Sequence, residues 1–254
     1  MSRIIASALA AAGLWLAIPL KADVIVSSSI NLTGLSISPA SGSVSIISPF
    51  AASAFAQAQD SLGGFANQFN TVNDTATSAS AATSLASGSA AASVPGLTAS
   101  AASGVNISHV TASASGSGNG GPGSLAGLFE ITGTTGMVNV TLSAPLTGNQ
   151  SLTTNDGGQT ASSEIIFSLL LPDIDSSNPE LFYDNPLTIG PNSTLVSPLN
   201  TTLTTSVSLM ANTQYTLIVD VDAESSGLNI VPEPSLFVIT ALGLIGLSVL
   251  RRRK

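Results

Sequence analysis

Residues 137–143 read MVNVTLS, and this stretch decides the fold class of the chain. Val138, Val140 and Leu142 alternate with polar residues, so on an extended strand they share one face. A period of two is typical of a half-buried strand, whereas an amphipathic helix repeats about every 3.6 residues. The stretch therefore predicts a β-strand that packs one face on a core.

Two later stretches repeat this pattern. Residues 202–209 alternate hydroxyl-bearing residues with Leu203, Val207 and Leu209, which we expect to point inward. Residues 215–221 place four apolar side chains on one face, namely Tyr215, Leu217, Val219 and Val221. Repeated strands without a long amphipathic helix indicate an all-β fold.

Turn signals separate these strands. Residues 155–158 read Asn-Asp-Gly-Gly, a strong turn signal, and the apolar run 165–171 that follows predicts a fully buried strand. Short strands joined by turns favour an antiparallel β-sandwich, jelly-roll-like, over residues 23–230. A parallel β-helix is the alternative, but the chain lacks the fixed-length repeat of that fold.

Residues 51–126 are dominated by Ala, Ser, Gly and Thr. Disorder is one interpretation, because few large apolar side chains are present to offset the entropy of ordering. However, Ala occupies every even position of 52–58, and residues 111–115 alternate in the same way. We therefore expect ordered β-structure with mobile loops, including a loop at the Gly-rich stretch 118–123.

The N-terminal residues 1–22 have the features of a secretory signal peptide. Arg3 precedes an apolar stretch that breaks at Pro19, which predicts a signal helix with cleavage between Ala22 and Asp23. The alternative is a permanent N-terminal membrane anchor, for which the apolar stretch is short. We expect export across the inner membrane, with signal peptidase as a partner.

The C-terminal residues 231–254 contain three ordered parts. Pro232, Glu233 and Pro234 come first, then the uncharged apolar run 235–250, which spans about 24 Å as a helix at ~1.5 Å per residue. The last part is a basic tail, Arg251, Arg252, Arg253 and Lys254. Such a run predicts a transmembrane helix, and the basic tail places its end in the cytoplasm.

This three-part ending resembles the PEP-CTERM sorting signal of Gram-negative bacteria. The resemblance covers the last 24 residues and implies that an exosortase, a membrane-embedded sorting enzyme, cuts near Pro232–Pro234. It also implies a role beside exopolysaccharide in biofilm or floc, after release or transfer of the protein. An ordinary C-terminal membrane anchor is the alternative.

Charge is distributed unevenly along the chain. All six basic residues lie in the two terminal segments, so residues 23–232 hold 13 acidic residues, no Lys or Arg, and a formal charge of −13. Such a surface repels nucleic acid and anionic lipid. The chain has no Cys, which excludes disulfides and thiol chemistry.

Catalytic signatures are scarce, and we expect a protein that is not an enzyme. His109 is the only histidine, and no Gly-x-Ser-x-Gly motif accompanies it. If the protein were a secreted hydrolase, Glu130, Glu164 and Glu180 would be the first acids to mutate.

Asp220, Asp222 and Glu224 form the one acidic pattern of interest. Their spacing puts three carboxylates on one face of a strand, where Ca²⁺ could relieve their repulsion. Asp173 and Asp175 form a weaker candidate in a loop. A solvated outer face without metal is the favoured interpretation, so we expect no cofactor, with Ca²⁺ as the alternative.

Three classes of function follow from these observations. The first is a non-catalytic exported protein, sorted to the cell surface or exopolysaccharide matrix, with a structural or adhesive role. The second is a calcium-assisted carbohydrate-binding module, and the third is a secreted hydrolase. The membrane is a partner only through the C-terminal helix, before processing.

Overall fold

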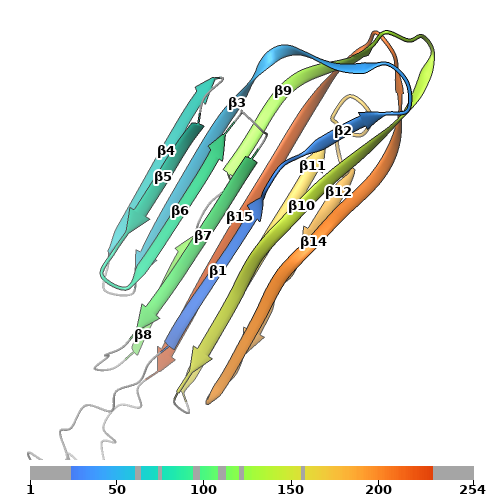
Figure 1. The fold of residues 1–254 in the computed structure, drawn as a ribbon. Helices are drawn as coiled ribbons and strands as arrows, with labels where there is room; N and C mark the ends of the chain where they lie inside the picture. Colours follow the sequence, from blue (N-terminus) through green and yellow to red (C-terminus); the bar gives the residue numbers. More distant parts are fainter. Residues whose placement is uncertain are drawn as a thin grey trace, which may run out of the picture.

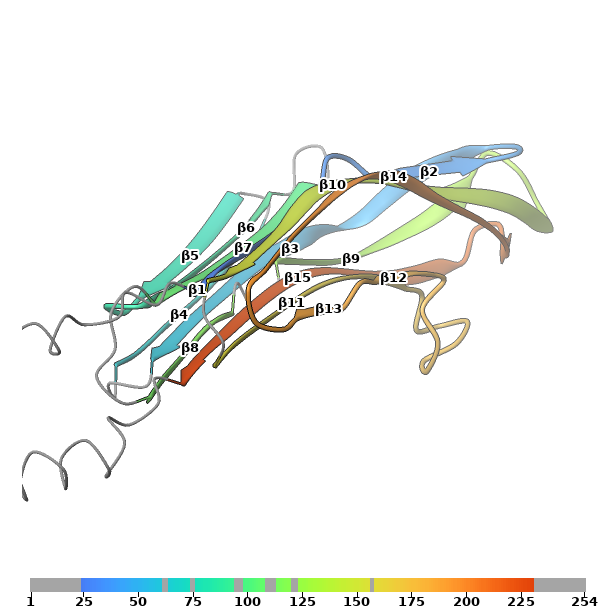
Figure 2. The same ribbon diagram turned by 90° about the horizontal axis from the view of Figure 1, so that it is seen from below.

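The computed structural model describes residues 24–60, 64–73, 76–93, 98–107, 113–119, 123–155 and 158–230. These residues form strands and no helix. The strands make two sheets, here called sheet A and sheet B, which lie as two layers (Figures 1 and 2). Every strand pair among these residues is antiparallel, which confirms the all-β, sandwich-like prediction and excludes the parallel β-helix. The jelly-roll detail stays a prediction.

Sheet A has seven strands. In spatial order they are β14 (Ser193–Met210), β10 (Met137–Thr154), β1 (Val24–Leu32), β7 (Thr98–Ile107), β6 (Ala86–Ser93) and β5 (Ala76–Ala82), with β2 (Ser36–Pro39) paired to β10. Sheet B has eight. In spatial order they are β12 (Leu181–Asp184), β11 (Gln159–Leu170), β15 (Gln214–Ile230), β8 (Ser113–Asn119), β3 (Ser43–Asp60) and β4 (Phe65–Asn73), with β13 (Leu187–Ile189) on β11 and β9 (Gly123–Thr132) on β15 and β3.

The predicted alternation matches the observed burial on three strands. Val138, Val140 and Leu142 of β10 are buried, and so are the four apolar residues predicted on β15. On β14, Leu209 is buried, while Leu203 and Val207 pack against the core with partial exposure. Burying such side chains stabilises the fold by about 1.5–3 kcal/mol each.

The Ala-rich segment forms strands, as predicted. Ala52, Ala54, Ala56 and Ala58 of β3 are all fully buried, because the even positions face the partner sheet. The predicted loop over 118–123 is wrong at its ends. Asn119 closes β8 and Gly123 opens β9, and both strands run antiparallel to β15, at Glu224 and Val221 respectively. Pairing with β15 overrides the local preference of Gly for a loop.

The turn predicted at 155–158 lies between two strands, β10 and β11, but these belong to different sheets. The chain therefore crosses from sheet A to sheet B here, so the two strands are not a hairpin. The prediction of a fully buried strand over 165–171 is wrong. Ile165, Phe167 and Leu169 are buried, whereas the alternate residues are partly exposed on the outer face of sheet B.

A layer of polar side chains divides the core. Ser28 and Gln150 are register partners in sheet A, and Ser163 and Ser225 are register partners in sheet B. Ser28 Oγ lies 2.9 Å from Ser225 Oγ, and Gln150 Nε2 donates to Ser163 Oγ at 2.8 Å, so both bonds join the sheets. We call these four residues the polar layer.

Two apolar clusters lie on opposite sides of the polar layer. The larger contains the bulky side chains of Phe50, Phe129 and Phe167. The smaller is rich in Ala and includes Val24 and Val26. Along β1, these two valines precede Ser28, and Ile30 of the larger cluster follows it. The polar layer fixes the strand register, because a slip by two residues would place apolar side chains against its hydrogen-bonding groups.

The two ends of the described chain lie at the same end of the sandwich. β1 begins at Val24 and β15 finishes at Ile230, and the two strands run in opposite directions past the bond between Ser28 and Ser225 (Figure 1). Segments that precede residue 24 or follow residue 230 therefore attach at one end of the molecule.

Candidate functional site

A groove of about 410 Å³ lies on sheet B and is lined by Gln57, Ser162, Glu164, Thr188, Glu224 and Ser226, among others. Strand register explains this grouping. Glu164 is opposite Glu224, and both Glu224 and Gln57 are opposite Asn119 of β8. Residues directly opposite in an antiparallel pair point to the same face. The side chains of Gln57, Glu224 and Glu164 therefore form a row across the strands.

The carboxylates near the groove repel one another. Burial, together with the nearby Asp184 and Glu224 carboxylates, raises the pKa of Glu164, which also hydrogen-bonds Asp184. Burial, with the charges of Glu224, Glu164 and Asp220, raises the pKa of Asp222 to about 6. Residues 23–232, here called the body, contain no Lys or Arg to offset these charges. Asp222 therefore takes up a proton as the pH falls to about 6, and this acidic face suits ligands that present cations or hydroxyl donors.

The predicted acidic triad sits as expected on one face of β15. Asp220 and Asp222 are partly buried and Glu224 is exposed, while the residues between them face the core. Within the described ranges, no group of three or more His, Cys, Asp or Glu side chains has the arrangement of a metal site. Calcium binding stays the alternative to a solvated face without metal.

The loop acids Asp173 and Asp175 have structural partners instead. Asp173 Oδ2 accepts a hydrogen bond from the Thr216 amide at 2.5 Å, which ties the loop to β15. Asp175 accepts bonds from the side chains of Asn178 and Ser177, which hold its pKa well below the usual value. The Ser177 backbone amide also donates to Asp175 Oδ1, at 2.8 Å, which forms an Asx turn that orders the loop.

The three acids named for a hydrolase are not brought together. Glu130 is opposite Gln214 and Glu164 is opposite Glu224. These positions are ten residues apart along β15, or about 33 Å at ~3.3 Å per residue. The Glu180 amide donates a hydrogen bond to the Leu169 carbonyl. Leu169 is five residues from Glu164 along β11, which is about 16 Å of strand. At about 33 Å, Glu130 and Glu164 are too far apart to flank one glycosidic bond, which requires a separation below about 10 Å.

Sequence reasoning missed an aromatic edge beside the groove. Phe65 and Phe69 of β4 are 58% and 65% exposed, and Phe69 is opposite Phe55 of β3. Between the two β4 phenylalanines, Asn67 is opposite Gln57, which lines the groove. The spacing of 65, 67 and 69 is a usable signal for one strand face, but only strand pairing places that face next to the acids.

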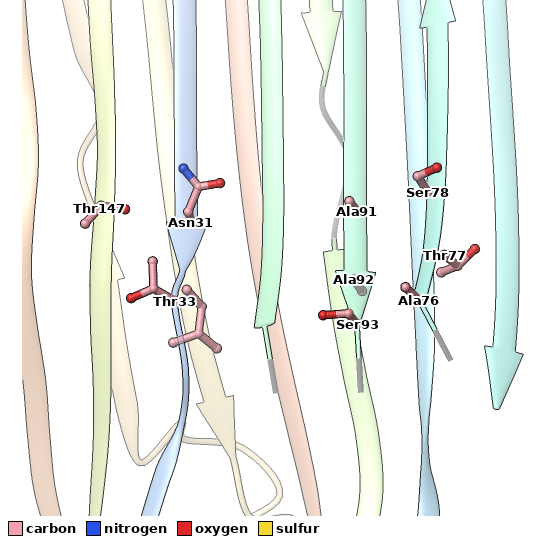
Figure 3. A pocket seen from close by; sticks show the side chains of 10 residues that line it. Asn31, Thr33, Ala76, Thr77, Ser78, Ala91, Ala92, Ser93 and Thr147 are labelled. Atoms are coloured by element: carbon pink, nitrogen blue, oxygen red, sulfur yellow. The ribbon is translucent and has the colours of Figure 1, made fainter. Parts of the chain in front are cut away.

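A second pocket, of about 630 Å³, lies on sheet A (Figure 3). Figure 3 shows Asn31 and Thr33 on one side of it and Ala91 and Ser93 on the other. Its lining residues carry hydroxyl, amide and methyl groups and include no ionisable side chain. These lining residues can therefore form hydrogen bonds with a ligand, but none of them can act as an acid or a base, or activate a nucleophile.

Several predicted site residues lie outside the described residues. These are His109, the cleavage position Ala22–Asp23, the motif Pro232–Pro234, the apolar run 235–250 and the basic tail Arg251–Lys254. A helix able to cross a membrane is not found in the part of the chain that the structure describes.

Comparison of the chain with protein-family models, curated proteins and solved structures found no match.

Proposed function

We propose that the chain is an exported, non-catalytic protein that is sorted by its C-terminal tail to the cell surface or exopolysaccharide matrix, where it is structural or adhesive. The observation that carries this proposal is the confinement of all six basic residues to the two terminal segments, each next to an apolar run. Residues 1–22 then act as a signal helix, and residues 235–250 as a transmembrane helix.

The arrangement of the sandwich supports this topology. Because Val24 and Ile230 lie at one end, both membrane-directed segments attach there, and the rest of the body extends away from the membrane. Signal peptidase removes the first segment, and an exosortase-type enzyme removes the second. Both cuts leave a body of formal charge −13, which stays soluble through self-repulsion.

A substitution in the tail tests the sorting step. Glu233→Ala alters the motif, and Glu130→Ala makes the same chemical change in the body. We expect Glu233→Ala to leave unprocessed protein in the inner membrane, while Glu130→Ala reaches the surface like the native chain. Normal surface delivery of the Glu233→Ala protein would contradict a role for the motif.

Carbohydrate binding is the second candidate function, and the aromatic edge favours it. Exposed phenylalanine rings can cover the apolar face of a sugar, and the adjacent Gln57, Glu224 and Glu164 can bond its hydroxyl groups. The row crosses the strands, whose spacing is about 4.8 Å, so it suits several linked sugar units.

A glycan array with and without Ca²⁺ tests this candidate. We expect Phe65→Ala and Phe69→Ala to abolish any binding, whereas Phe182→Ala, a 55% exposed residue at the far edge of sheet B, leaves it unchanged. Equal binding by all three variants would exclude the aromatic edge.

Thermal unfolding with Ca²⁺ and with chelator tests the acidic triad, and an unchanged midpoint would remove calcium from the proposal.

A further inference from the structure

The two sheets differ completely in charge. The strands of sheet A contain no Asp, Glu, Lys, Arg or His. The acids that occur in strands all belong to sheet B, and they are Asp60, Glu130, Glu164, Asp184, Asp220, Asp222 and Glu224. Two copies of such a negatively charged protein repel each other when their B sheets approach. Sheet A is the surface where they can approach without that penalty.

Strand β14 is a long open edge of sheet A. It pairs with β10 along all 18 of its residues, and no other described strand pairs with it. An edge strand presents unpaired N–H and C=O groups that can bond another strand, and natural proteins usually protect it with charges or a short length. β14 contains no charged residue and has one proline, Pro198. Its exposed side chains include Val196, which is 57% exposed.

The opposite edge of sheet A is protected within the chain. The Ser80 amide of β5 donates to Gln68 Oε1 at 2.8 Å, and Asn70 Nδ2 donates to the Ser78 carbonyl at 2.5 Å. Two side chains of β4 thus take the place of a neighbouring strand. On β14, a comparable bond occurs at the last residue, where the Met210 amide donates to the Tyr215 hydroxyl at 2.8 Å.

We infer that β14 is a docking edge for a second copy of this chain. The two β14 strands pair antiparallel about a two-fold axis, which joins the two A sheets into one continuous sheet. Such a contact is isologous, so it closes as a dimer and does not grow into a fibre. The acids remain in the B layers, and Thr, Ser and Asn side chains face one another across the new pair, where hydroxyl pairs are favourable.

Single-cysteine cross-linking tests this contact, because the chain has no Cys of its own. Each variant of the full chain carries one cysteine, in place of one of the exposed residues Asn200, Thr202, Thr204 and Ser206. The variants are purified in detergent and then oxidised. A residue next to the two-fold axis comes within disulfide range of the same residue in the second copy, whereas a residue farther from the axis does not. We expect one maximum of dimer yield along β14.

Two controls show whether the cross-link is specific. Ser89→Cys lies on β6, inside sheet A, and Ser226→Cys lies on β15 in sheet B; both side chains are exposed. We expect neither to give the disulfide dimer. Equal yield at these positions, or none at any β14 position, would overturn the inference.

A charge substitution gives an independent measurement. Thr202→Lys places like charges close together across the two-fold axis, so sedimentation should show dimerisation weakened by about tenfold. Ser89→Lys adds the same charge away from the edge and should leave the dimer unchanged. Association through the C-terminal segment would be insensitive to both, and that result would contradict docking at β14.

Discussion

Ser28 of sheet A and Ser225 of sheet B hold their hydroxyl oxygens 2.9 Å apart, and Ser28 also donates to the Glu224 carbonyl at 2.7 Å. These bonds lie between the two apolar clusters, where a polar group without a partner would cost about 1–3 kcal/mol. The sandwich therefore depends on a complete polar layer as well as on apolar burial.

Gln150→Leu should destabilise the sandwich by about 2–3 kcal/mol. Gln150 is fully buried, and its amide bonds Ser163 Oγ, the Asn185 carbonyl and the Asn185 side chain. Leucine would leave these groups without partners. Asn149→Leu, one residue away on the outer face of β10, is the matched control. Denaturant unfolding measures both, and equal stability of the two variants would contradict the role of the polar layer.

Gln68→Ala should expose the edge of β5. The Ser80 amide loses its acceptor, so its hydrogen exchange should accelerate, and stability should fall by about 0.5–1.5 kcal/mol. Gln59→Ala removes the same side chain from an exposed position on the outer face of β3 and serves as control. If exchange at Ser80 were the same in both variants, Gln68 would not protect this edge.

Stability should increase on acidification from pH 7 to about pH 4. The folded-state pKa of Asp222 is raised to about 6 from 3.8, mainly by burial and then by Glu224, so the folded state binds more protons than the unfolded state between these values. Stability therefore falls as pH rises through this window. Asp222→Asn should flatten the dependence and stabilise the protein by about 1–3 kcal/mol at pH 7. A free energy of unfolding that rises from pH 4 to pH 7 would contradict this.

Gly127→Ala should destabilise the core by about 1–3 kcal/mol, through overpacking. A methyl group at Gly127 would lie 2.6 Å from the ring of Phe50, which is buried and confined. Gly190→Ala is the control, because a methyl group there meets nothing within 4 Å. Similar unfolding midpoints for the two variants would show that Phe50 can move aside.

The sequence predicts which face of a strand is buried better than it predicts the strand's neighbours. Alternation at Val138, Val140 and Leu142 gives the inner face of β10 correctly, since side-chain direction is a local property. Pairing is set by the whole sheet. The sequence therefore could not show that β10 and β11 lie in different sheets.

The same limit applies to the candidate site. The shared face of Asp220, Asp222 and Glu224 follows from their spacing, and the structure confirms it. The approach of Gln57 and Glu164 to Glu224 depends on β8 and β11, which pair with β15 over long sequence separations. The polar layer could not be predicted from the sequence for another reason. Ser28 and Ser163 occupy inward positions that a hydrophobic pattern assigns to apolar residues.

The proposed function depends on removal of the C-terminal tail after export. The most direct measurement is mass spectrometry of the C-terminus of the exported protein, from cells with and without the sorting enzyme. We expect an exported chain that ends near Pro234 in the first case and an intact tail through Lys254 in the second. Exported protein that retains Arg251–Lys254 in cells with the enzyme would contradict removal of the tail.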